Sequence, residues 1–320
     1  MTNKRKSNRQ LLAGVRQWAE AVRDWGQRTL FWRAWERMLE IEFVDRSVAL
    51  AGKAFVSFFP LVIVVAAFVP QRVRSSILAA LTYRLGIQGH AMAIVQQAFA
   101  SSEDVRQATG ILGLVLTFFF ASAFTTALQR LYLRAWRRAP AGKVGAYTRG
   151  LVWLPGVLVY MALLGGCRAL AGEGAGVGVF LLVSLMGTCA LWWCTAWFML
   201  LGQVRWRVLT PTGLITGLAM WGYAMSATIW MPGLISRNDT QFGFFGVALA
   251  LVTWLSGAAL CVLVGACAGT VLAEDNGAVG ALIRGRKDEL LVEGAAPPLP
   301  APTHAPRLRD AFRPTPEQEE

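Results

Sequence analysis

Lys53 is the charged side chain with the clearest potential for chemistry, because it stands at the entry of an apolar run that is uncharged from Ala54 to Gln71. An ionisable residue within a membrane segment is a candidate functional group. One interpretation is that Lys53 lines a cytoplasm-facing cavity and meets an anionic headgroup or substrate. The other is that its apolar stem lets the ammonium group reach the membrane surface, about one to two helical turns away. Asp45 lies eight residues earlier on a similar face, so both charges could border one vestibule.

Pro60 and three polar residues of a later apolar segment complete the candidate substrate region. A proline inside a helix removes a backbone hydrogen bond and kinks it. In a membrane, the freed group needs a partner or a water-lined cavity. Thr125, Thr126 and Gln129 give the later segment a polar end. They could line such a cavity or form hydrogen bonds between helices. For Pro60, a plain structural kink is the favoured interpretation.

The chain shows no arrangement typical of an enzyme. Its two histidines, His90 and His304, lie far apart in the sequence, whereas a metal-dependent nuclease needs clustered histidine or carboxylate ligands. It has no Ser-His-Asp arrangement, nucleotide-binding loop or Gly-x-Ser-x-Gly elbow. Its five cysteines form no Cys-x-x-Cys pair, so no zinc site is indicated. We therefore expect a protein that is not an enzyme and holds neither a metal nor a cofactor.

The composition is that of a membrane protein. Of the 320 residues, 55% are hydrophobic and 16% are charged, against roughly 25% charged in soluble domains. The net charge of +12 comes mostly from Lys and Arg that flank apolar runs, which is a pattern of membrane topology. We therefore expect membrane lipid and an anionic or amphiphilic substrate as partners, and no nucleic acid. The oligomeric state stays open.

Six apolar segments predict an all-α, polytopic protein with six transmembrane helices. Each is long enough for the ~20 residues that cross a ~30 Å hydrocarbon core, the third only just. Their continuous apolar character favours helices over the alternating pattern of a β-barrel. They lie at about 47–69 and between Arg106 and Arg130, Arg149 and Arg168, Glu173 and Arg205, Arg207 and Arg237, and Asp239 and Glu274.

The charges of the connecting loops predict that both termini are cytoplasmic. The loop between the second and third segments is basic from Arg130 to Arg149 and contains no acidic residue. Arg205 and Arg207 lie between the fourth and fifth segments. The loops after the third and fifth segments carry acidic residues as well. Basic loops stay on the cytoplasmic side, which places both ends of a six-span chain there.

These assignments divide the chain into three parts. A basic amphipathic arm occupies 1–46, the membrane domain 47–273, and a flexible, proline-rich cytoplasmic tail 274–320. Within the membrane domain, the stretch 72–106 would lie outside the cell. Its helically spaced apolar residues predict two short amphipathic helices on the outer surface of the membrane.

The arm repeats aromatic and basic residues every seven positions. Trp18, Trp25 and Trp32 share one position, and Arg16 and Arg23 fall on another face. Such a helix can lie at the membrane interface and attract anionic lipid. Alternatively, the tryptophans pack against the cytoplasmic ends of the protein's own helices, and the two interpretations are compatible.

Glycines recur at four-residue steps in the later segments. Gly213 and Gly217 form one such pair, and Gly257 and Gly265 belong to a second series on the last segment. Small residues at this spacing let helix backbones approach closely. We expect these glycines to serve helix packing.

Three ordered motifs suggest a family. The first segment carries RSVALA at 46–51 and FVSFFPL at 55–61, the second ends in SAFTTALQRLY at 122–132, and the sixth has FGFFG at 242–246 with TWL at 253–255. Together they resemble the YihY/BrkB family of bacterial inner-membrane proteins, once labelled ribonuclease BN-like. The chain departs from that pattern at Cys267, where many members have an acidic residue, and at Lys53, a position that is usually uncharged.

The resemblance implies a six-helix protein of the bacterial cytoplasmic (inner) membrane that is linked to envelope integrity. We therefore expect a protein that transports or handles an amphiphilic envelope molecule. The alternative is a non-transporting membrane scaffold that binds envelope partners. Ribonuclease activity is not expected, because no candidate nuclease residues are clustered in the sequence.

Overall fold

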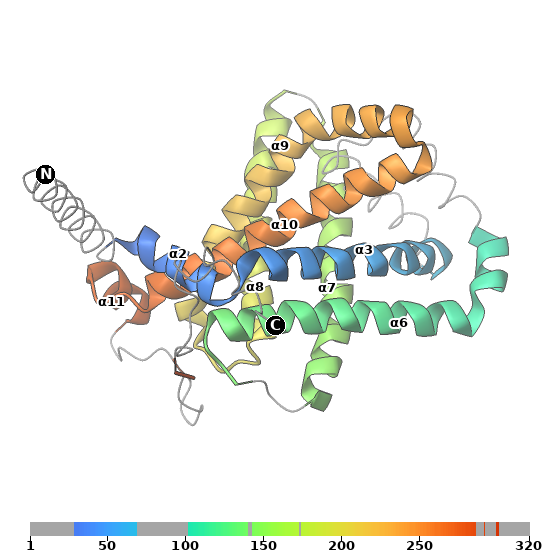
Figure 1. The fold of residues 1–320 in the computed structure, drawn as a ribbon. Helices are drawn as coiled ribbons and strands as arrows, with labels where there is room; N and C mark the ends of the chain where they lie inside the picture. Colours follow the sequence, from blue (N-terminus) through green and yellow to red (C-terminus); the bar gives the residue numbers. More distant parts are fainter. Residues whose placement is uncertain are drawn as a thin grey trace, which may run out of the picture.

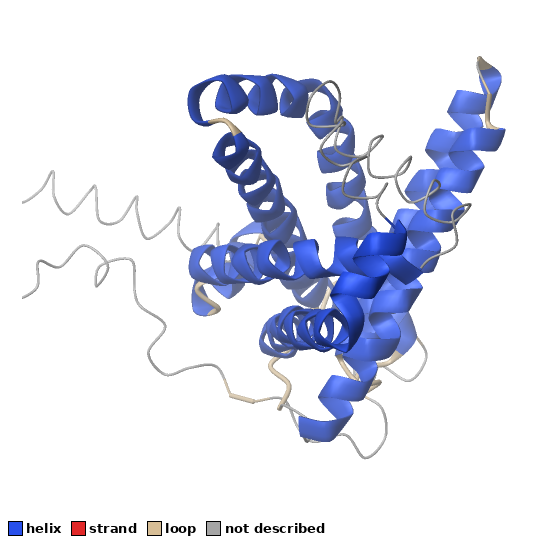
Figure 2. Cartoon of the chain, turned by 90° about the vertical axis from the view of Figure 1, so that its right-hand side faces the viewer, coloured by secondary structure: helices blue, strands red, loops and turns tan. Residues whose placement is uncertain are grey.

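The computed structural model describes residues 29–68, 102–139, 143–172, 174–285, 291 and 299–300. Every regular element within these ranges is a helix (Figure 2), which confirms the predicted all-α class for the described part of the chain. In chain order the elements are α2 (Leu30–Glu40), α3 (Phe43–Phe68), α6 (Ser102–Ala135), α7 (Lys143–Leu170), α8 (Ala175–Met199), the 3-10 helix η1 (Trp206–Leu209), α9 (Thr210–Phe242), α10 (Phe244–Ala273) and α11 (Ala278–Arg284).

The six long helices form a ring. α3 packs against α6, α6 against α7, α7 against α8, α8 against α9, and α9 against α10, while α10 also packs against α3. Figure 1 shows α3 and α6 side by side with opposite chain directions, and α10 next to α3. The first and last of the six helices are therefore neighbours.

Three of the long helices contain an interior proline: Pro60 in α3, Pro155 in α7 and Pro232 in α9. Each proline removes a backbone donor from the helix and favours a bend. Figure 1 shows α9 changing direction along its length. Neighbouring helices can satisfy the freed backbone groups, which is why membrane helices tolerate such prolines.

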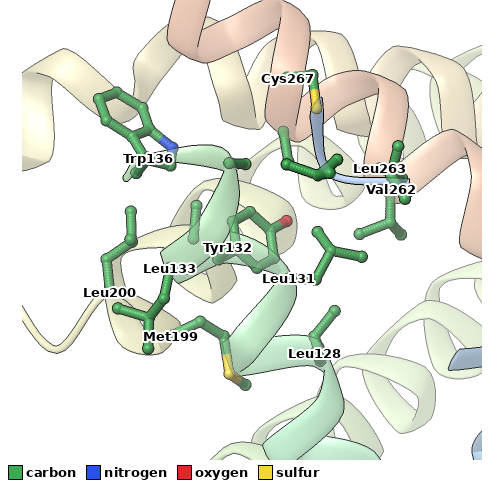
Figure 3. Packing of buried hydrophobic residues seen from close by; sticks show 14 of the residues in the cluster. Leu128, Leu131, Tyr132, Leu133, Trp136, Met199, Leu200, Val262, Leu263 and Cys267 are labelled. Atoms are coloured by element: carbon green, nitrogen blue, oxygen red, sulfur yellow. The ribbon is translucent and has the colours of Figure 1, made fainter. Parts of the chain in front are cut away.

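One end of the ring is closed by a buried apolar cluster, which we call the closed end. The cluster takes side chains from α2, α3, α6, α8, η1 and α10. Tyr132 and Leu263 are fully buried in it, and Figure 3 shows Tyr132 pointing from α6 toward α10 near Leu263 and Cys267. The short elements α2, η1 and α11 lie at this end (Figure 1).

Toward the opposite end, the described helices pack in pairs. Met231 and Ile235 of α9 form a small buried cluster with Ala250 of α10. Leu164 of α7 forms another with Phe180 of α8. Among the described side chains, each of these two clusters joins two helices.

Four helical stretches of the described part are long and apolar enough to cross a membrane. They are Val152–Leu170, Ala175–Met199, Trp206–Phe242 and Phe245–Ala273. Large apolar side chains on them face outward, such as Ile229 and Met186, which are 84% and 72% exposed. Outward apolar side chains are what a lipid environment favours, so these helices indicate a membrane protein.

Several boundaries differ from the sequence-based ones. α3 begins at Phe43 rather than Ser47, directly after a turn in which Glu42 has a φ of 54°. α9 continues to Phe242, so Arg237 lies in a helix rather than in a loop. α6 begins at Ser102, inside the stretch predicted to be external. Charged residues do not stop a helix, because backbone hydrogen bonding continues where the chain leaves the apolar region.

The segment that follows α10 returns to the closed end. α11 packs against α10, Leu291 forms an isolated antiparallel bridge with Val204, and the Leu299 N–H donates to the Arg137 carbonyl at 2.7 Å. The first part of the predicted tail is therefore attached to the bundle. The two predicted external helices, apart from the start of α6, lie outside the described residues.

Candidate functional site

The candidate region is built on the antiparallel pair α3 and α6. The Thr117 hydroxyl of α6 donates to the Pro60 carbonyl of α3 at 3.0 Å. The contact joins the two helices beside the proline, where the regular ladder is interrupted. The carbonyl that the proline leaves without a donor is that of Val56, four residues earlier, so the Thr117 contact is a link between the two helices rather than the predicted partner of the freed group. Thr117 could not be identified from its neighbours in sequence.

The six candidate residues divide between the interior and the surface of the bundle. Thr125 and Gln129 are buried, at 3% and 5% exposure, whereas Asp45 and Lys53 are exposed. Thr126 and Pro60 are half-buried. Asp45 and Lys53 lie on one face of α3, since eight residues are about two turns, or roughly 12 Å along the axis. The structure therefore does not gather all six into a single site.

The Thr125 hydroxyl is bonded within its own helix. It donates to the carbonyl of Ala121 at 3.0 Å or to that of Ser122 at 3.1 Å. Back-bonding of this kind satisfies a buried hydroxyl without a partner helix. The acceptor side of the Thr125 oxygen stays free to receive a hydrogen bond.

The four predicted packing glycines lie at close helix contacts. A Cβ added at Gly213 would lie 2.5 Å from the Trp193 Cβ, and one at Gly217 would lie 2.5 Å from the Cys189 Cα, both on α8. A Cβ at Gly257 would meet the Tyr223 hydroxyl, and one at Gly265 would meet Thr216, both on α9. These distances leave no room for a methyl group.

Hydrogen bonds from aromatic side chains join α7, α8 and α9. The Trp153 indole donates to Thr195 at 3.0 Å, the Tyr160 hydroxyl lies 2.8 Å from that of Thr188, and the Trp221 indole donates to Ser184 at 2.9 Å. Sequence reasoning missed these contacts. The signal was present, because Ser184, Thr188 and Thr195 follow at spacings of four and seven residues and so share one face of α8.

Arg37 of α2 is a buried charge at the closed end. Its side chain is 6% exposed and donates to Glu274 at 2.6 Å and to the Ala135 carbonyl at 2.9 Å. These contacts tie α2 to the ends of both α6 and α10. Charge-assisted hydrogen bonds between buried groups are stronger than neutral ones.

Two further ion pairs flank Arg37. Arg33 lies 2.8 Å from Asp275, and Arg137 contacts both carboxylate oxygens of Glu40 at 2.8 and 2.9 Å. Sequence reasoning missed this network. The sequence signal for this network was two adjacent acidic residues at the end of the last apolar segment, in a chain that also carries a basic arm.

The described part of the predicted arm packs on the bundle. Thr29 caps α2 by accepting a hydrogen bond from the Trp32 amide at 3.4 Å. The Trp32 indole donates to Glu36 of its own helix at 2.7 Å, and Trp35 packs against the main buried cluster. Trp35 is not part of the predicted tryptophan stripe, so the two interpretations of that stripe both stay predictions. The other predicted interface residues, Trp18, Trp25, Arg16 and Arg23, lie outside the described residues.

No protein-family model, curated protein or solved structure matches this chain. The similarity to the YihY/BrkB family therefore stays a prediction. Among the described residues, no three His, Cys, Asp or Glu side chains are grouped so that they could hold a metal ion.

Proposed function

We propose that the chain crosses the membrane six times, with α3 and α6 as spans in addition to α7, α8, α9 and α10. α3 has 26 residues and α6 has 34, which correspond to ~39 Å and ~51 Å at 1.5 Å per residue. Both carry apolar runs and lie in the same ring as the four apolar helices. The bundle contacts that support this arrangement join α3 to α6 and to α10.

The closed end faces the cytoplasm in this proposal. The segments that end or begin there carry Arg130, Arg134, Arg205 and Arg207. The first and last helices of the described chain, α2 and α11, lie at the same end (Figure 1). Basic residues are retained on the cytoplasmic side. Cysteine labelling from outside intact cells tests this: a cysteine introduced at exposed Arg237 is labelled, and one at exposed Arg207 is not.

The function that the geometry supports best is the handling or transport of an amphiphilic envelope molecule. One observation carries it: the Thr117 hydroxyl joins α6, with the buried Thr125 and Gln129, to α3 beside Pro60, and α3 carries Lys53 on its exposed surface. This helix pair offers polar and charged side chains next to exposed apolar ones, as an amphiphile requires. The polar group of the amphiphile would contact Lys53 on the surface of the kinked α3 and the buried Thr125 and Gln129 of α6.

Reconstitution tests the proposal. The purified chain is placed in liposomes with labelled anionic and zwitterionic lipids, and their movement between leaflets is followed. We expect anionic lipid to move faster than in empty liposomes, and Lys53→Met to slow this movement at an unchanged protein level. If no labelled lipid moves faster than in empty liposomes, lipid translocation is excluded; a fully active Lys53→Met variant favours a lysine that only reaches the membrane surface.

A scaffold that binds envelope partners is the second candidate. The observation that favours it is α2, which is fixed to the bundle by ion pairs yet leaves Phe31 78% exposed. Phe31→Ser removes the exposed ring and leaves the ion pairs of α2 in place. The scaffold predicts that this replacement abolishes partner recovery in cross-linking while the six-helix core stays folded. Neither candidate assigns a catalytic residue, a nuclease activity or a cofactor to this chain, and both agree with the family resemblance.

A further inference from the structure

The contact between Thr117 and Pro60 fixes which parts of α3 and α6 lie at the same level. The two helices run antiparallel, so residues before Pro60 lie beside residues after Thr117. Arg46 is fourteen residues before Pro60, and Arg130 and Arg134 are thirteen and seventeen after Thr117. At 1.5 Å per residue these positions are ~21, ~20 and ~26 Å from the contact. Three arginines thus meet at one level near the closed end.

Their side chains also share one side of the helix pair. Arg130 and Arg134 are four residues apart, one turn of α6, and both are exposed. Arg46 stands at their level on α3, which packs against α6, and its side chain is partly exposed, at 38%.

The negative charge beside these arginines is incomplete. Glu42, 57% exposed, accepts a hydrogen bond from Arg46 at 3.0 Å, and the exposed Asp45 precedes Arg46 in the chain, so three arginines stand beside two carboxylates. The Arg46 Nε is buried without a hydrogen-bond partner. Like charges one turn apart destabilise a helix, and a buried unpaired donor costs free energy. An anion bound among them would relieve both.

The surface next to the arginines is apolar. Phe119, eleven residues before Arg130, lies three turns away on the same face of α6, and it is 64% exposed. Leu116, one turn further, is 42% exposed. A phosphate bound at the level of the arginines would therefore contact cations. Acyl chains attached to it would contact apolar side chains along the next three to four turns of α6.

We propose that Arg46, Arg130 and Arg134 form a binding site for the phosphate of an anionic phospholipid, whose acyl chains lie along Leu116 and Phe119. Guanidinium groups suit phosphate because their planar N–H donors match its oxygens. Basic sites between membrane helices on the cytoplasmic side bind anionic headgroups by the same physics. Lys53 adds a fourth cation, since seven residues, or two turns, place it on the face of α3 that carries Arg46. The proposal rests on the membrane placement of α3 and α6 given above.

Lipid retention by the full chain in detergent tests the site. The purified protein is offered phosphatidylglycerol or phosphatidylcholine, and bound lipid is counted by native mass spectrometry. We expect phosphatidylglycerol to be retained preferentially. Each arginine replaced by glutamine should weaken this retention about fivefold, the effect of one basic residue near anionic lipid, and Arg130→Gln/Arg134→Gln should remove most of it. Arg237→Gln, an exposed arginine at the other end of α9, is the charge-matched control and should change nothing.

Thermal unfolding in detergent separates lipid binding from a structural role. Without lipid, Arg130→Gln should unfold at the same temperature as the parent chain or slightly higher, because repulsion from Arg134 is reduced. Phosphatidylglycerol should raise the unfolding temperature of the parent chain and not that of the double variant. A double variant that unfolds earlier without lipid, or that keeps phosphatidylglycerol, overturns the proposal.

Competition with soluble glycerol phosphate tests whether the site recognises the phosphate group alone or the whole lipid. We expect it not to displace bound phosphatidylglycerol at millimolar concentration, because it lacks the acyl chains that contact α6. Complete displacement would contradict the assignment of a lipid. Lipid binding is measured in detergent, so it can be found even if the liposome assay shows no transport. Conversely, a chain that retains no phosphatidylglycerol in detergent can still move lipid in liposomes.

Discussion

At the closed end, one buried cluster joins side chains of α2, α3, α6, α8, η1 and α10, and buried Arg37 ties α2 to the ends of α6 and α10. Toward the opposite end, the described clusters join α9 to α10 and α7 to α8, two helices each. The same six helices are thus held together in two ways. The charged end is fixed by ion pairs and by a cluster that several helices share. The described contacts farther along the helices are apolar clusters of two helices and single hydrogen bonds, such as the one from the Trp221 indole to Ser184.

The difference follows from the solvent. Inside a bilayer, lipid tails are as apolar as leucine, so apolar burial gives helices little reason to associate. Ion pairs at the membrane surface are directional and specify geometry. Substitutions at the closed end should therefore change the stability of the bundle more than substitutions at exposed positions farther along the helices. The following predictions test that contrast.

Replacing Arg37 with methionine should have the largest effect. The change leaves Glu274 and the Ala135 carbonyl without their donor, and breaking a buried pair in this way costs about 3 kcal/mol. Chemical denaturation in mixed micelles measures the loss. Arg237→Met, at an exposed position at the far end of α9, should leave the free energy of unfolding almost unchanged. Equal losses at the two positions would remove the contrast between the ends.

A methyl group at Gly265 should have the next largest effect. The added Cβ would meet Thr216, whose Cα would lie 2.7 Å away, and overpacking at such a contact costs about 2 kcal/mol. Gly222 of α9 has nothing within 4 Å of an added Cβ. Gly222→Ala should therefore be neutral or stabilising by up to ~1 kcal/mol, because alanine favours the helix. The denaturation assay should rank the variants in this order; the reverse order would show that α9 and α10 can shift apart.

The parts of the molecule that are local in sequence were the parts that could be predicted. Continuous apolar runs predict long helices, and the four-residue spacing of Gly213 and Gly217 predicts a close contact without naming its partner. Arg37 and Glu274 are 237 residues apart, and nothing in either neighbourhood selects the other. Helical periodicity places Asp45 and Lys53 on one face of α3, but only the packing of the neighbouring helices decides that this face is exposed.

The hydrogen bond between Thr117 and Pro60 lies between the two regions and should matter less. Thr117→Val keeps the shape of the side chain and removes the donor, and hydrogen bonds between membrane helices average about 0.6 kcal/mol. The free energy of unfolding should fall by about that amount. Thr117→Ser, which keeps the hydroxyl, is the control. A loss above ~2 kcal/mol would mean that the α3–α6 pair, rather than the closed end, holds the fold.

The half-buried ion pair between Arg33 and Asp275 should give the smallest effect, although it lies one turn from Arg37. The two side chains are 35% and 23% exposed, so water and salt screen their attraction, and such pairs contribute roughly 0–1 kcal/mol. Arg33→Gln should lower the free energy of unfolding by about 0.5 kcal/mol in 50 mM salt and by less in 1 M salt. The loss in Arg37→Met should change far less with salt, because its guanidinium is buried among protein groups. If both losses respond to salt in the same way, the closed end is held by solvent-exposed charges, and Arg37 has no special role in fixing α2.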